Sequence, residues 1–208
     1  MRLHIGKNPV ESPPSPIPEG WRSIRQPGPF LSFLLSALLF PCALTTGLVA
    51  LDIIVAGTDN TSSAPTNGVP WGVILLALLL FIPTHEALHL AFHPGLGRTP
   101  RSHLVIWLSK LRFGVYFDGC MTRTRWLIMR SAPFVVLSML PIAILGLMKD
   151  SSSGSTLSIF LQFMMIFNGI GSSGDGAAMV LVLIQVPPSS SLCFQEGRAY
   201  WTQGIIRK

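Results

Sequence analysis

Residues 71–92 read WGVILLALLLFIPTHEALHLAF. The stretch contains no charged side chain before His85, and its ionisable residues His85, Glu86 and His89 all lie near its end. A helix needs about 20 predominantly apolar residues to cross a bilayer, and this stretch supplies that length. The sequence therefore predicts a transmembrane helix that carries a small group of ionisable side chains close to one end.

Three other apolar runs are long enough to cross a bilayer, namely Phe30–Val55, Trp126–Met148 and Leu157–Val186. The whole chain of 208 residues is 49% hydrophobic and only 12% charged, whereas soluble domains are about 25% charged. Three cysteines are too few for a disulfide scaffold or a cysteine-rich zinc domain. We expect an all-α membrane protein with four transmembrane helices and a small cytoplasmic β-hairpin-like loop.

The basic residues predict how the chain is oriented. Fourteen of the fifteen Lys and Arg residues lie before Phe30, between the second helix and the first turns of the third, or after the fourth. Loops rich in Lys and Arg stay in the cytoplasm, so both termini and the loop 93–125 should be cytoplasmic. The expected location is the plasma membrane, as a multi-pass protein. Because the positive charges are spread between apolar runs, we expect no nucleic-acid partner.

The chain divides by composition into three parts. Residues 1–29 contain seven prolines and few large apolar groups, so they predict a disordered cytoplasmic leader. Residues 30–186 form the four-helix transmembrane domain, and residues 187–208 form a cytoplasmic tail.

The loop 93–125 shows more local pattern than the leader. Residues 104–111 suit an interfacial helix, and residues 112–117 alternate enough to predict a strand. Asp118-Gly119 is a favourable hairpin turn, which would pair this strand with residues 120–124.

The ionisable residues of the second helix have the pattern His85-Glu86-x-x-His89. Side chains four apart share one helix face, so the two imidazoles can bind one Zn²⁺. Glu86 would lie beside the ion, where it can take a proton from zinc-activated water and deliver it to a leaving amine. Ionisable groups within a membrane helix mark a functional site by default. The simpler alternative is a set of interfacial polar side chains at a helix end.

A catalytic zinc site needs a third protein ligand. Asp175 is the only charged residue of the fourth run and lies in the Gly- and Ser-rich segment 168–176. It should lie at the same depth as the two histidines, towards the cytoplasmic side. His93 is the alternative ligand, but it precedes Pro94, where the helix should end. Asn168 could either hold a substrate backbone or cap the break in the helix.

These motifs resemble two groups of proteins. His85-Glu86-Ala87-Leu88-His89, followed by Asn168 and Asp175-Gly176, is similar to the site-2 protease class of intramembrane metalloproteases. A compact family of zincin membrane peptidases is more similar still, through Arg-Phe-Gly-Val at 112–115, Ala-Pro-Phe at 132–134 and Gln185-Val186-Pro187. The resemblance covers about residues 75–202. The chain lacks the prolines that site-2 proteases place between the Asn and the Asp.

The resemblance implies a zinc-dependent, membrane-embedded peptidase that cleaves membrane or membrane-proximal proteins. Peptidases commonly bind substrate as an added strand at a sheet edge, so we expect residues 112–117, with Gly114 and Val115, to bind substrate near the zinc. The alternative is an interfacial loop that is anchored in the membrane surface by Phe113, Tyr116 and Phe117. A non-catalytic membrane metal-binding protein is one alternative. A di-iron membrane oxygenase is another, although five histidines are few for such a site. The substrate and the oligomeric state stay open.

Overall fold

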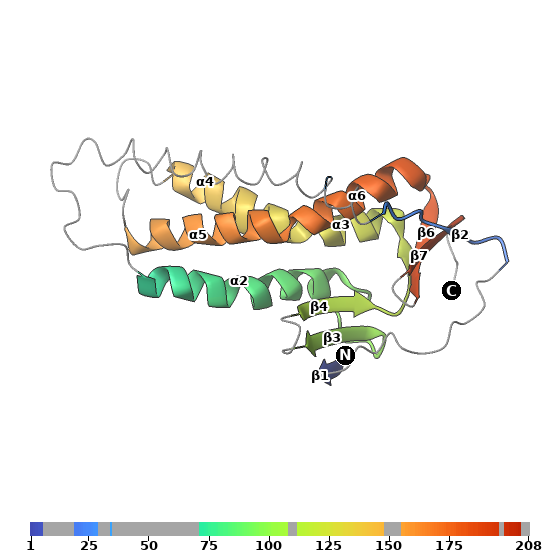
Figure 1. Cartoon of the computed structure of the whole chain (residues 1–208), viewed down its shortest axis with the longest axis horizontal. Helices are drawn as coiled ribbons and strands as arrows, with labels where there is room; N and C mark the ends of the chain where they lie inside the picture. The colour runs from blue at the N-terminus through green and yellow to red at the C-terminus, as the bar shows by residue number, and fades with distance from the viewer. Residues whose placement is uncertain are drawn as a thin grey trace. The chain divides into compact units, whose positions relative to one another are not determined.

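The computed structural model describes residues 1–5, 19–28, 34, 71–107, 112–147, 155–195 and 198–204 (Figure 1). Apart from Leu34, the predicted first transmembrane helix, Phe30–Val55, lies outside the described residues. The chain divides into two compact units. One consists of Met1–Ser32, Glu86–Ser131 and Ala177–Lys208, and the other of Phe33–His85 and Ala132–Gly176.

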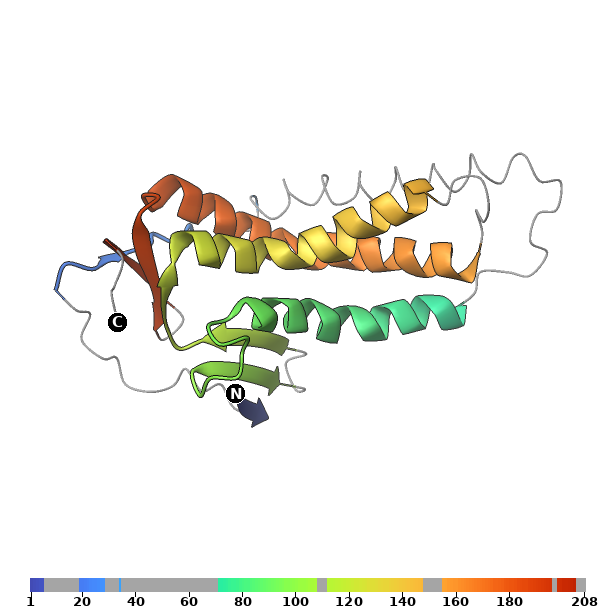
Figure 2. The same cartoon turned by 180° about the vertical axis from the view of Figure 1, so that it is seen from behind.

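Two described helices are long and apolar enough to cross a membrane. Helix α2 spans Trp71–Phe92, the predicted bounds, and continues through Pro83. The second span, Arg123–Leu147, consists of α3 (Arg123–Phe134), the π-helical turn η2 (Val135–Met139) and α4 (Leu140–Leu147), which follow one another without a break (Figure 2). Leu75 and Leu79 of α2 are 56% and 62% exposed, as expected of side chains that face lipid.

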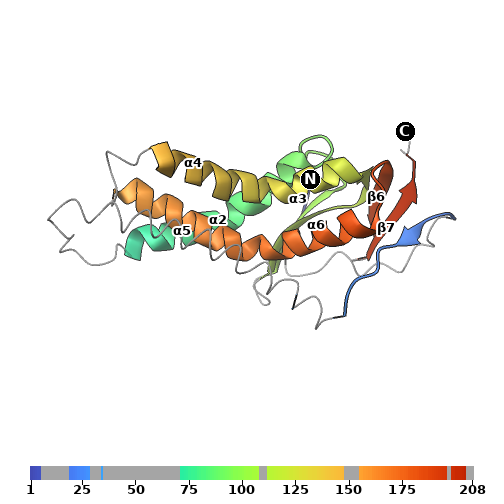
Figure 3. The same ribbon diagram turned by 90° about the horizontal axis from the view of Figure 1, so that it is seen from above.

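A third candidate span consists of two helices that meet at a bend. Helix α5 (Thr156–Gly171) and helix α6 (Ser173–Gln185) meet at Ser172 with a bend of 47° (Figure 3). Sharp helix bends occur at Gly and Ser pairs, and Gly169, Gly171 and Gly174 flank this one. The described residues thus contain two or three candidate spans. The predicted orientation of the chain stays a prediction.

The expectation of an all-α protein is wrong, because the described residues also form two β-sheets. The first sheet has the order β1-β3-β4, with β1 (Arg2–Ile5) parallel to β3 (Ser102–Trp107) and β3 antiparallel to β4 (Arg112–Phe117) (Figure 1). Strand β4 is therefore an edge of this sheet among the described strands. Its bounds agree with the predicted strand.

The second sheet has the order β2-β7-β6-β5 and is antiparallel throughout. Its strands are β2 (Arg22–Ser23), β5 (Gly119–Thr122), β6 (Ser190–Gln195) and β7 (Arg198–Gln203). Strands β1 and β2 come from the segment expected to be a disordered leader, and β6 and β7 come from the expected tail. Leu192 and Trp201 of this sheet pack in a buried apolar cluster that also includes Trp126 of α3 and Val182 of α6.

Two details of the predicted cytoplasmic loop are also wrong. Ser102–Trp107 form a strand where an interfacial helix was expected over residues 104–111. Residues 112–117 and 120–124 do not pair as a hairpin, because the chain changes sheets at Asp118. The Asp118 N–H donates to the Arg101 carbonyl (N···O 2.8 Å), and β5 then pairs with β6. Cys120 of β5 and Cys193 of β6 lie opposite each other and form a disulfide.

Candidate metal centre

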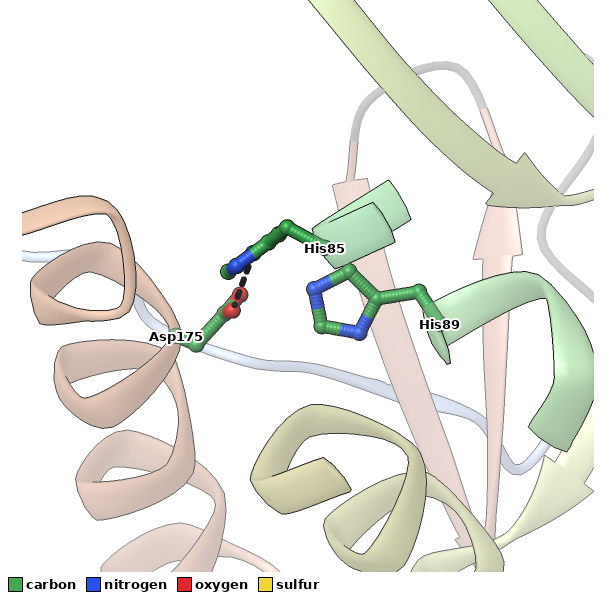
Figure 4. A group of neighbouring side chains, drawn as sticks. All are labelled: His85, His89 and Asp175. Carbon is green, nitrogen blue, oxygen red and sulfur yellow. Dashed lines mark ion pairs between the residues drawn. The ribbon is translucent and has the colours of Figure 1, made fainter. Parts of the chain in front are cut away.

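Three buried side chains converge at one point, as Figure 4 shows for His85, His89 and Asp175. One potential ligand atom from each residue lies within 4.8 Å of the other two. Within the part of the chain that the structure describes, this is the one group of three or more His, Cys, Asp or Glu residues that could hold a metal ion. The three residues are those that the sequence predicts as metal ligands.

Local helix geometry explains why these side chains meet. His85 and His89 lie one turn apart on α2 and so share a face. Asp175 lies in the first turn of α6, directly after the bend at Ser172. The exposed N–H groups of a helix N-terminus favour a negative charge. The bend between α5 and α6 therefore supplies a favourable position for Asp175, the only carboxylate of these two helices.

The donor set fits zinc. The Nε2 atom of His85 lies 3.3 Å from Oδ2 of Asp175. Two ligands at 2.0–2.1 Å from a tetrahedral ion are about 3.4 Å apart, so this separation suits two members of one coordination shell. Two imidazole nitrogens and one carboxylate oxygen are a usual protein ligand set for catalytic zinc. The fourth position of a tetrahedron would be left for water or substrate.

In both His85 and His89, the ring nitrogen Nδ1 has a hydrogen-bond partner from the protein. Nδ1 of His89 lies 2.9 Å from the Met129 carbonyl oxygen, and Nδ1 of His85 lies 3.0 Å from Oδ1 of Asn168. A carbonyl oxygen only accepts hydrogen bonds, so Nδ1 of His89 carries the proton. The Nε2 lone pair of a neutral His89 is then available to a metal ion. Such outer partners typically fix the orientation of metal-binding histidines.

Glu86 is half-buried and contacts the edge strand β4. Its Oε2 atom accepts a hydrogen bond from the Val115 N–H (N···O 2.9 Å). Because an antiparallel strand directs alternate N–H groups to opposite sides, this bond shows that the Val115 N–H points away from β3. The carboxylate thus lies at the edge of β4 that pairs with no other described strand, where the sequence predicts that substrate binds.

His93 is not a member of the metal-binding group. It follows the last residue of α2, is only 1% exposed, and its Nδ1 lies 3.3 Å from Oγ of Ser102. Burial, with smaller contributions from His89 and the arginines Arg130 and Arg125, lowers the pKa of His93 to about 4. The imidazole is therefore neutral near pH 7, and it packs edge-on against Phe117.

The remaining predicted site residues occupy different surroundings. Gly114 pairs with Val105 in the β3–β4 ladder, and Val115 pairs with Leu104. Asn168 is completely buried and contacts His85. Sequence reasoning missed the Met129 carbonyl and Ser138, which is a partner of Asn168. A backbone carbonyl carries no signal in the sequence, and a π-helical turn at Ser138 has no recognisable pattern either.

Comparison with known proteins gives one match. A sequence-family model described as "Putative zincin peptidase" matches residues 78–191, which is more than half of the chain. The matched range contains His85, Glu86, His89 and Asp175. No curated protein and no solved structure matches the chain.

Proposed function

The chain belongs to this zincin-type peptidase family, and we propose that it is a zinc-dependent, membrane-embedded peptidase. One observation carries the proposal: the buried convergence of His85, His89 and Asp175, with Glu86 between the two histidines in sequence. The proposed substrates are membrane proteins or the membrane-proximal segments of proteins, because the histidines lie in a helix that is apolar enough to cross a bilayer.

Each residue has a defined task in this proposal. The Nε2 atoms of His85 and His89 and the Asp175 carboxylate would hold Zn²⁺. Bound zinc supplies Lewis acidity, which polarises a peptide carbonyl and lowers the pKa of water. Glu86 accepts a proton from the attacking water at its carboxylate and delivers that proton to the nitrogen of the leaving amine. The hydrogen bond from the Val115 N–H fixes the orientation of this carboxylate.

Peptide hydrolysis by the purified full chain in detergent tests the proposed function. We expect cleavage within a library of quenched-fluorescent peptides, loss of that cleavage with 1,10-phenanthroline, and recovery when Zn²⁺ is restored. Hydrolysis that resists the chelator would contradict zinc dependence. Absence of any cleavage by the zinc-loaded chain, across the library and detergent-solubilised membrane proteins, would contradict peptidase activity.

We propose that substrate pairs with the open edge of β4. An extended peptide can add to a sheet edge through main-chain hydrogen bonds. The alternation of the ladder turns the N–H of Phe113 to the same side as that of Val115. A peptide bound there would lie next to the Glu86 carboxylate. Gly114, whose N–H points to β3, contributes no side chain that would hinder this approach.

The variant Phe113→Pro tests docking without disturbing Glu86. Proline removes the edge N–H of residue 113 and leaves the Val115–Glu86 hydrogen bond in place. We expect kcat/KM to fall about two- to tenfold, the effect of one backbone hydrogen bond, with zinc content unchanged. Phe113→Ala, which keeps the N–H, is the matched control for the lost ring. Equal kcat/KM in the two variants would contradict docking at this edge.

A further inference from the structure

The amide of Asn168 has an unusually complete set of partners. Its side chain on α5 is 0% exposed. The Nδ2 atom donates to the Pro133 carbonyl (3.1 Å) and to Oγ of Ser138 (2.8 Å). The Oδ1 atom lies 3.0 Å from Nδ1 of His85 and accepts from Oγ of Ser172 (3.2 Å). All four partners belong to the protein itself.

These partners determine which tautomer of the neutral His85 imidazole is present. The Pro133 carbonyl can only accept, so the amide atom that faces it must be the nitrogen. The oxygen of Asn168 therefore faces His85, and because this oxygen can only accept, Nδ1 of His85 must carry a proton. In the neutral ring the lone pair is then on Nε2, the atom 3.3 Å from Asp175.

The π-helical turn η2 explains why two acceptors are available to Asn168. In an α-helix, residues five apart, such as Pro133 and Ser138, are separated by about 140° around the axis. A π-helix forms hydrogen bonds between residues five apart, as the Leu140 N–H does here with the Val135 carbonyl. The wider turn therefore brings the Ser138 hydroxyl round towards the side of the Pro133 carbonyl. Ser138 is 1% exposed, so its contact with Asn168 is shielded from water.

We propose that η2 and Asn168 together form a positioning device for the metal ligand His85. Pro133 and Ser138 orient the amide, the amide selects the Nδ1–H form of the imidazole, and the Nε2 lone pair is directed at the metal. This inference rests on the proposed zinc function and assigns Asn168 to His85 instead of to substrate. The π-helical turn, which is rare and often found at functional sites, thereby acquires a role.

Zinc affinity, measured on the purified full chain by competition with a chromophoric chelator, tests this inference. We expect Asn168→Leu to weaken zinc binding about 10- to 100-fold, the usual effect of losing an outer partner of a metal ligand. Ser138→Ala should weaken it about two- to tenfold, because one hydrogen bond to the amide is lost. The absorption spectrum of the Co²⁺-substituted protein should change in both variants, since the ligand geometry changes.

Ser158→Ala is the matched control. Ser158 is likewise a buried serine, but it lies on α5 and its hydroxyl donates to the Ser155 carbonyl near the start of that helix. It should leave the zinc affinity unchanged. If Asn168→Leu does not fold, the zinc affinity and the Co²⁺ spectrum of Ser138→Ala alone test the inference.

The outcomes separate this inference from the proposed function. Wild-type zinc affinity and Co²⁺ spectrum in Ser138→Ala would overturn the positioning role. So would an Asn168→Leu variant that binds zinc normally but has a raised KM, because Asn168 would then bind substrate. A wild-type chain that binds no zinc would instead overturn the proposed function itself.

Discussion

The Glu86→Gln variant should keep its zinc and lose peptide hydrolysis, with kcat lower by about 10²- to 10⁴-fold. Glutamine has nearly the same shape as glutamate, and its amide oxygen can still accept the hydrogen bond from the Val115 N–H. The amide cannot accept a proton from water at neutral pH. The variant therefore removes the proposed general base while the strand, the helix and the metal ligands stay in place.

A carboxylate elsewhere in the same unit provides the control for Glu86→Gln. Asp118 is exposed and lies between β4 and β5, so Asp118→Asn makes the same chemical change away from the metal ligands. We expect its kcat to equal that of the wild type. Should Glu86→Gln retain kcat within about threefold of the wild type, Glu86 would not be the general base.

Replacing Asp175 by Ala should have a comparably large effect, but through loss of the metal. The variant leaves only His85 and His89 as protein ligands, and catalytic zinc sites generally have three. We expect zinc affinity to fall by more than about 100-fold, beyond the effect of an outer partner, and hydrolysis to fall to background. The measurements are zinc titration and the peptide assay.

The Asp175→Ala change also destabilises α6, because the Asp175 carboxylate lies in the first turn of this helix and interacts favourably with its N-terminus. Removing a charge from that position costs about 0.3–1 kcal/mol, which is small beside the loss of a metal ligand. Asp175→Asn, which also removes this charge but keeps a carbonyl oxygen, separates the two effects. We expect its thermal stability without metal to match that of Asp175→Ala, and its zinc affinity to be intermediate.

The bounds of α2 and the three residues of the candidate metal site could be predicted because the signals are local. The length of the apolar run alone gives the bounds of α2, and Gly and Ser residues mark the break between α5 and α6. The spacing of His85 and His89 follows from helix geometry. Asp175 could be found because a lone acid in an apolar run is costly unless it has a function.

Strand β4 could be predicted from its own pattern, but the pairings of β1 with β3, β2 with β7 and β5 with β6 could not, because these strands are distant in sequence. Arg2 in β1 lies opposite His103 in β3, and Cys120 in β5 lies opposite Cys193 in β6. Asp118-Gly119 has the composition of a hairpin turn, but here it directs the chain into a second sheet. A contact between residues so far apart leaves no periodicity in either segment. The same reason hides the contact between Asn168 and Ser138.

Zinc content per chain, measured by mass spectrometry on the purified full-length protein, tests the central claim most directly. The comparison needs the wild type, Asp175→Ala and His93→Ala, since His93 is the alternative third ligand. We predict about one zinc per chain in the wild type and in His93→Ala, and almost none in Asp175→Ala. Zinc retained by Asp175→Ala and lost by His93→Ala would contradict a His85, His89 and Asp175 site.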